Sequence, residues 1–113
     1  MATDAELLEW IKAVVGVGNF RIRPHATRHM FKKGILERDM IEAVTGKSCI
    51  LEHYPDESRC LVIGYFQISE NVRSPLHLVF EYSREDEDTV DIVTAYIPQK
   101  PWWITPRQRG KTK

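Results

Sequence analysis

The hydrophobic positions in the N-terminal segment recur at intervals of three and four residues, which is typical of a helix with one buried face. Thr3 and Glu6 have the spacing of a capping box, in which each side chain satisfies a free backbone N–H of the other residue. The first helix is therefore predicted to begin at Thr3 and to end at the glycines 16 and 18.

Two further helices are predicted before residue 46. Pro24 suits the first turn of a helix because its ring presets the backbone angle, and this helix is expected to run to about Lys33 and stop at Gly34. A third helix is expected over roughly 37–44, ending at Gly46. A short extended segment, Phe20–Arg23, precedes the second helix.

Beyond Gly46 the pattern changes to alternating or continuous β-branched positions, which predicts strands. The expected strands are Cys49–Tyr54, Arg59–Phe66, Leu76–Tyr82 and Val90–Ile97, joined by segments 55–58, 69–74 and 83–89. Helices followed by an antiparallel meander predict an α+β fold, with three N-terminal helices packed on one face of a four-stranded antiparallel sheet. The residues expected under the helices are Leu76, Leu78, Phe80, Val90 and Ile92.

Composition places the chain among ordinary soluble globular proteins. It has 113 residues, 42% of them hydrophobic, and 16 basic residues balance 16 acidic ones. We predict one domain over 1–104 and a basic, flexible tail over 105–113. No apolar run is long enough to span a membrane and no secretory signal opens the chain, so a cytoplasmic protein is expected. Cys49 is expected to pair near Gly64, too far from Cys60 for a disulfide, so both cysteines are predicted to be free thiols.

Charge is segregated along this neutral chain. Segment 21–38 holds six bases and one acid, segment 81–91 holds six acids and one base, and segment 99–113 holds five bases and no acid. This predicts a basic face that suits a phosphate-rich ligand, with the acidic segment pointing away. The residues expected to bind phosphate, and RNA if the ligand is a nucleic acid, are Arg21, Arg23, Lys32, Lys33, Lys100 and Arg107. Just before the tail, Trp102 and Trp103 either stack on the bases of a single-stranded nucleic acid or close the edge of the core.

The second predicted helix carries the strongest candidate chemistry. His25, Arg28, His29 and Lys32 fall within one arc of its surface, where cations can hold phosphate and imidazoles can transfer protons near neutral pH. The alternative is a solvated basic face without chemistry. His25 and His29 also have the spacing of a zinc-binding helix, but Ala26 stands where that motif has its glutamate, and no metal site or other cofactor is predicted.

Two strand residues can assist this helix. His77 alternates with the apolar positions of its strand, and Tyr96 shares a face with Ile92 and Thr94. If the apolar faces of the two strands align, His77 and Tyr96 point to opposite sides of the sheet, and a register change of one residue reverses this. Sequence alone leaves both arrangements open, and a half-buried structural histidine is the other interpretation of His77.

Three stretches, taken together, resemble the DUF4258 family, a group placed in the RelE-like toxin superfamily. They are His25–Met30 with Lys33–Ile35, Leu61–Tyr65 with Pro75–Val79, and Ile92–Pro98 with Trp102. The resemblance covers about residues 20–104 and implies a RelE-like α+β domain. One position departs from the family pattern: His29 stands where the family has an arginine, with Arg28 just before it.

The resemblance implies a toxin of a bacterial toxin–antitoxin pair that cleaves messenger RNA without a metal, either on the ribosome or on free RNA. A base would activate the ribose 2′-hydroxyl, cations would stabilise the phosphorane, and an acid would protonate the 5′-oxygen. His25, Arg28 and His29 are then the expected catalytic residues, assisted by His77 or Tyr96. The expected partners are RNA and an antitoxin protein encoded by a neighbouring gene. The alternative is a non-enzymatic module of this fold that binds a partner protein or RNA.

Overall fold

Local sequence signals set the ends of the helices. The computed structural model describes residues 3–99 and 103–110. Its three helices are α1 (Asp4–Gly16), α2 (Pro24–Lys33) and α3 (Glu37–Thr45). The capping box of α1 is formed, with side-chain to backbone hydrogen bonds of 3.0 and 3.1 Å between Thr3 and Glu6. Gly34 ends α2 with a φ of 70°, a left-handed conformation that glycine adopts without strain. The three predicted helices are confirmed.

Five strands form the main sheet in the order β1-β5-β4-β3-β2. Their bounds are β1 Phe20–Ile22, β2 Cys49–Tyr54, β3 Arg59–Ser69, β4 Val72–Glu81 and β5 Val90–Tyr96. The predicted four-stranded antiparallel sheet needs a correction, because β1 adds a fifth strand parallel to β5, with Arg21 paired with Asp91. A three-residue strand shows no alternation, and its partner lies far along the chain, so its pairing left no local signal. The other neighbouring pairs are antiparallel.

The hairpin between β3 and β4 is longer than predicted. The sequence suggested a connection over 69–74, but β3 reaches Ser69 and β4 starts at Val72, with Asn71 at a φ of 66° in the tight turn. Pro75 lies inside β4, opposite Tyr65. Because β5 pairs with β4 only from His77 onward, one edge of β4 is unpaired at Pro75, where a residue without an N–H is tolerated.

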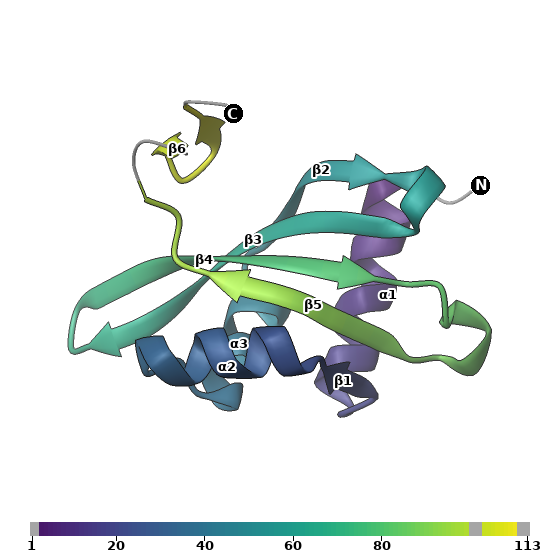
Figure 1. Cartoon of the computed structure of the whole chain (residues 1–113), viewed down its shortest axis with the longest axis horizontal. Coiled ribbons are helices and arrows are strands. Elements are labelled where there is room, and N and C mark those ends of the chain that lie inside the picture. The colour runs from purple at the N-terminus through teal and green to yellow at the C-terminus, as the bar shows by residue number, and fades with distance from the viewer. Residues whose placement is uncertain (1–2, 100–102, 111–113) are drawn as a thin grey trace.

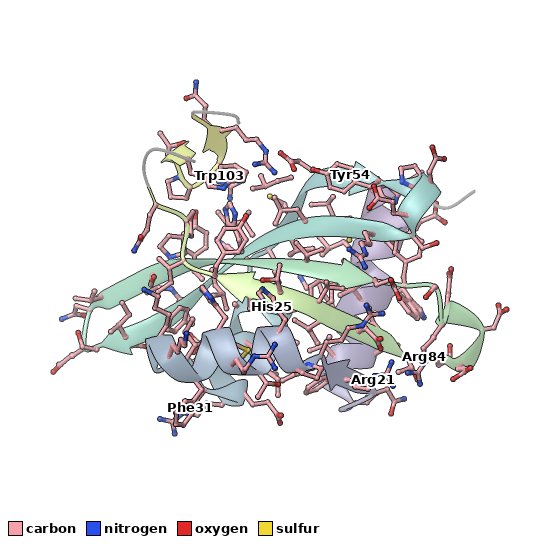
Figure 2. The ribbon with its side chains drawn as sticks, viewed as in Figure 1. Arg21, His25, Phe31, Tyr54, Arg84 and Trp103 are labelled. Atoms are coloured by element: carbon pink, nitrogen blue, oxygen red, sulfur yellow. The ribbon has the colours of Figure 1, made fainter. Side chains whose placement is uncertain are left out.

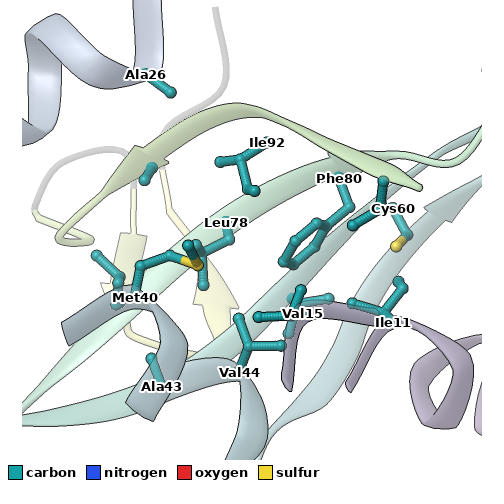
Figure 3. Packing of buried hydrophobic residues seen from close by; sticks show 14 of the residues in the cluster. Ile11, Val15, Ala26, Met40, Ala43, Val44, Cys60, Leu78, Phe80 and Ile92 are labelled. Carbon is teal, nitrogen blue, oxygen red and sulfur yellow. The ribbon is translucent and has the colours of Figure 1, made fainter. Parts of the chain in front are cut away.

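The three helices cover one face of the sheet (Figure 1). The five residues predicted to lie under them are all buried in the core between helices and sheet, as Figure 3 shows for part of this cluster. Gly64 of β3 lies against α3 so closely that a Cβ there would come within 2.0 Å of the Ala43 carbonyl oxygen. This glycine therefore sets the distance between helix and sheet.

The C-terminal segment lies on the other side of the sheet (Figure 1). Strands β6 (Trp103–Thr105) and β7 (Gln108–Arg109) form a small hairpin there. Residues 105–110 were assigned to the tail from the sequence, and the structure places them in and beside this hairpin. Cys49 and Cys60 are both free thiols, as predicted, although Cys49 pairs with Ile63 instead of Gly64.

Candidate functional site

The outward side of α2 carries the basic residues that the sequence singled out. Ala26 and Met30 anchor the helix, because both are buried in the core beneath the sheet. The side chains on the remaining surface, which we call the α2 cluster, are His25, Arg28, His29, Lys32 and Lys33. All are exposed except His29, which is half-buried. Figure 2 shows His25 on this helix, on the other side of the sheet from Trp103.

The charges of the α2 cluster have no acidic partner among the residues that the structure describes. Within residues 3–99 and 103–110, none of its five side chains forms a hydrogen bond or an ion pair. Partial burial lowers the pKa of His29, and the charges of Lys33, His25 and Lys32 lower it further. A neutral imidazole next to fixed cations is the form that can accept a proton.

Arg21 and Arg23 were predicted from the sequence to lie on the same RNA-facing surface. In the structure they form ion pairs with acidic residues of the sheet instead. The pairing of β1 with β5 brings them to Asp91, at 2.8 Å for Arg21 and 3.0 Å for Arg23. Arg23 also bonds to Glu81. The acidic segment therefore does not point away from this end of the basic segment, and that part of the charge prediction is wrong.

Asp91 organises this ion-pair network from inside the protein. Its side chain is only 1% exposed, and besides the two bonded arginines it has Arg84 at 3.6 Å. Burial alone would raise the pKa of Asp91, but the hydrogen bonds from Arg21 and Arg23 outweigh it and hold the pKa below its usual value. The arginines at this end of the molecule thus serve the fold.

A bulge in β5 settles the relation between His77 and Tyr96. Phe80 pairs with Ile92, but Val79 pairs with Thr94, so Val93 is an extra residue in β5. The apolar faces align on one side of the bulge, and beyond it His77 lies directly opposite Tyr96. The two residues therefore share a face, and it is the face turned away from the helices.

His77 is fully buried there and has both ring nitrogens occupied. Nε2 lies 2.6 Å from the carbonyl oxygen of Pro106, and Nδ1 lies 3.2 Å from the hydroxyl of Tyr96. Since a carbonyl can only accept, Nε2 carries the proton and Nδ1 accepts from the tyrosine. Burial lowers the pKa of His77, which agrees with a neutral ring. The His77 ring also packs perpendicular to the Trp103 ring, with the ring centroids 4.4 Å apart.

The hairpin that covers His77 is held by residues that the sequence analysis did not select. Arg109 donates two hydrogen bonds to Glu52 of β2, at 2.6 and 2.8 Å, and lies over the Trp103 ring at 4.7 Å. Glu52 also accepts a hydrogen bond from Tyr54. The bond from Arg109 lowers the pKa of Glu52. No local pattern connects positions 52 and 109, so this contact gave no signal in the sequence.

The predicted site residues therefore fall into separate groups. His25, Arg28 and His29 lie together on α2, whereas His77 and Tyr96 lie together beneath the C-terminal hairpin. We call His77, Tyr96 and Trp103, with the carbonyl of Pro106, the His77 cluster. Trp103 is buried, as the core-edge alternative predicted. Arg107 is exposed and contacts Cys49, and Lys100 and Trp102 lie outside the described residues.

An apolar groove of about 560 Å³ lies beside the α2 cluster. β1 and α2 form its sides, and the segment that leads into α3 closes it. Two large apolar side chains on its rim are unusually open, with Phe31 86% exposed and Leu36 50% exposed. Phe31 points away from the sheet in Figure 2. Exposed apolar side chains that gather at a groove are typical of a contact surface for another protein.

Neither a metal cluster nor a membrane span is present in the described part of the chain. No three His, Cys, Asp or Glu residues gather there in a way that can hold a metal ion. The ring nitrogens of His53 in β2 lie 2.8 Å from Asp4 and 2.7 Å from the Tyr82 hydroxyl, within hydrogen-bond distance. None of the helices described is long and apolar enough to cross a membrane.

Comparison with known proteins gives a family without an assigned activity. No curated protein and no solved structure shows a significant match to this chain. The model of one family, described as a domain of unknown function (DUF4258), matches residues 22–97. The match begins just before α2 and ends just after β5, so it includes the α2 cluster, His77 and Tyr96. The chain belongs to the DUF4258 family.

Proposed function

We propose that this protein is the toxin of a bacterial toxin–antitoxin pair and that it cleaves messenger RNA without a metal, using the α2 cluster. The proposal includes the placement of this DUF4258 protein in the RelE-like toxin superfamily. One observation carries it: the α2 cluster gathers two imidazoles and three cations on an open surface.

The contrast with most of the other arginines supports this observation; Arg38 and Arg107 are the two that also lack a carboxylate partner in the described structure. Arg21, Arg23, Arg59, Arg73, Arg84 and Arg109 all have a carboxylate within ion-pair distance. In the described structure, Arg28, Lys32 and Lys33 have none. A set of cations left without counterions in a neutral protein favours a ligand that brings its own negative charge, and RNA phosphate is such a ligand.

The chemistry assigned to the cluster is an attack of a ribose on its own phosphate. His29, kept neutral, takes the proton from the 2′-hydroxyl, and the 2′-oxygen forms a bond to phosphorus. Arg28 stabilises the charge that develops on the phosphorane oxygens. As the bond from phosphorus to the 5′-oxygen breaks, His25 protonates that oxygen, leaving a 2′,3′-cyclic phosphate and a free 5′-hydroxyl.

His77 and Tyr96 have a different role in this proposal. Both ring nitrogens of His77 are bonded inside the protein, and the ring is closed off from solvent. A proton-transfer group must reach the substrate directly or through one water. We therefore assign the His77 cluster to holding the C-terminal hairpin on the sheet, and assign cleavage to α2 alone.

The test is induced expression in bacteria, with growth and RNA integrity followed together. His25→Ala and His29→Ala should each relieve growth arrest, because loss of one proton-transfer partner typically costs about 10²–10⁴-fold in rate. Both variants should melt close to the wild type. Arg38→Gln, at an exposed cation on α3, is the matched control and should stay toxic. Full toxicity of both histidine variants, or no arrest by the wild type, would contradict the proposal.

The groove beside α2 favours a second candidate, a non-enzymatic module that binds a partner protein. Here Phe31 and Leu36 would be the contact residues. Co-purification with the product of the neighbouring gene tests this, since Phe31→Asp should abolish a complex that the wild type forms. If the wild-type protein neither cleaves RNA nor arrests growth but forms this complex, the second candidate replaces the first.

A further inference from the structure

A second basic surface lies outside α2, and the assigned chemistry does not use it. It is a cavity of about 760 Å³, within the size range of small-molecule sites. Side chains from α1, β3, β4, the α3–β2 connection and the β6–β7 turn converge on it. Its principal lining residues are Lys12, Lys47, Ser48, Tyr65, Arg73 and Arg107.

The lining residues that the structure describes include four cations and no carboxylate. Of these four, Arg73 alone has an acidic neighbour in the described part of the chain, Glu42, and the 3.5 Å between them is long for a charge-assisted hydrogen bond. For Lys12, Lys47 and Arg107, the described residues supply no ion-pair partner. Four like charges facing one space repel one another, so an anion that enters the cavity relieves that repulsion.

The two arginines are held in place before any ligand binds. Arg107 donates from Nη1 to the sulfur of Cys49 at 3.0 Å, and Arg73 donates from Nη2 to the backbone carbonyl of Tyr65 at 3.2 Å. Each guanidinium has five N–H groups, so both keep donors for a ligand. Anchored donors lose less freedom on binding than free side chains do, which favours recognition of a compact anion such as phosphate.

Two further lining residues suit the rest of a nucleotide. The Ser48 hydroxyl donates a hydrogen bond of 2.8 Å to the backbone carbonyl of Val44, one of the carbonyl groups at the C-terminal end of α3. The oxygen of Ser48 is then free to accept a hydrogen bond, as from a ribose hydroxyl. Tyr65 adds a partly exposed aromatic ring, on which a base can stack.

We propose that this cavity binds a phosphate group attached to a nucleoside, with Lys47 and Arg107 on the phosphate and Tyr65 on the base. The phosphate can come from a free nucleotide or from an RNA chain. The site shares no residue with the α2 cluster, so this proposal can be tested independently of the proposed RNA cleavage. Its position also has a structural consequence: Arg107 directly follows Pro106, whose carbonyl holds His77, so a ligand on Arg107 stabilises the C-terminal hairpin.

Calorimetric titration of the full chain with adenosine 5′-monophosphate tests the proposal, with adenosine as the ligand that lacks phosphate. Saturable binding of the nucleotide and none of adenosine is expected. Lys47→Gln and Arg107→Gln should each weaken binding by about tenfold or more, the usual scale for a hydrogen bond to a charged group. Arg38→Gln is the matched control and should bind as the wild type does.

A competition arm separates the two sources of phosphate. A 5′-phosphorylated RNA hexamer that displaces the nucleotide, when the same hexamer with a 5′-hydroxyl does not, indicates a terminal phosphate. Displacement by both indicates the RNA backbone, and displacement by neither indicates a free nucleotide. The proposal is overturned if adenosine 5′-monophosphate does not bind saturably, if adenosine binds equally well, or if both variants bind like the wild type while remaining folded.

Discussion

The α2 cluster and the His77 cluster contain the same kinds of residue in opposite surroundings. Each pairs histidine with groups that can bind or polarise a substrate. On α2 the side chains are exposed, or half-buried in the case of His29, and their charges are unpaired within the described structure, whereas His77 is buried with both nitrogens bonded. The difference teaches that residue type alone does not mark a functional site. What distinguishes the two is whether the protein itself already satisfies the side chains.

The same contrast separates arginines with a carboxylate partner from those without one. Replacing Asp91, the carboxylate that Arg21 and Arg23 share, is expected to have one of the two largest effects on the free energy of unfolding. Asp91→Ala should destabilise the fold by about 3 kcal/mol, because it removes the charge-assisted hydrogen bonds from Arg21 and Arg23, whose exposed fractions of 60% and 31% limit the effect. Urea denaturation measures this. Asp86→Ala, at an exposed acid of the same segment, should change stability by less than about 0.5 kcal/mol. Equal effects of the two substitutions would mean that the network contributes nothing to the fold.

His77 and His25 test the two clusters against each other. His77→Ala should cost about 3 kcal/mol, since it opens space under the hairpin and leaves the Pro106 carbonyl and the Tyr96 hydroxyl without their partner. His25→Ala should stay within about 0.5 kcal/mol of the wild type, because its side chain is exposed. Thermal denaturation of both variants is the measurement. A His25→Ala protein as unstable as His77→Ala would remove the distinction between the clusters.

The pH dependence of stability sharpens the same comparison. The pKa of His77 is lowered by burial, so the unfolded chain takes up a proton below about pH 6.5 while folded His77 does not. Stability should therefore fall as the pH drops from 7 toward 5, by at most about 1.4 kcal/mol per pH unit for one proton. His77→Gln should remove most of this slope, and His29→Ala should leave most of it.

A separate acid transition is expected at lower pH. The pKa values of Glu52 and Asp91 lie below their usual range, so the stability from these carboxylates is lost only as the pH falls below about 4.5 and through the folded-state pKa values. The two pH-dependent losses of stability have different causes, so His77→Gln should leave the loss at lower pH in place. A wild-type slope between pH 7 and 5 that survives in His77→Gln would contradict the buried, neutral histidine.

The sequence predicted those features of the fold that depend on residues close together in the chain. The capping box of Thr3 and Glu6, the proline at the start of α2 and Gly34 at its end each act within a few residues, so the three helices could be placed in advance. The buried positions of β4 and β5 also followed, because strand alternation is local. The α2 cluster is visible for the same reason, since it lies on one helix.

Contacts between residues far apart in the chain could not be predicted from the sequence. Arg21 and Arg23 looked like RNA-binding residues because their acidic partners lie 58–70 positions away. These partners are in β5, which pairs with β1, and in β4, the next strand of the sheet, and no local pattern reveals this order of strands. One inserted residue, Val93, decides whether His77 and Tyr96 meet, and its effect appears only once β4 and β5 are paired. The Glu52–Arg109 contact depends likewise on how the C-terminal hairpin folds back over the sheet.

The salt dependence of RNA binding tests most directly whether α2 is the functional face. Fluorescence anisotropy of the full chain with a single-stranded RNA gives the affinity at several salt concentrations. Each phosphate contact contributes about −0.7 to the slope of log affinity against log salt. Arg28→Gln and Lys32→Gln should each weaken binding and flatten this slope by about that amount, while Arg38→Gln leaves both unchanged. Affinities and slopes identical in all three variants would contradict the account.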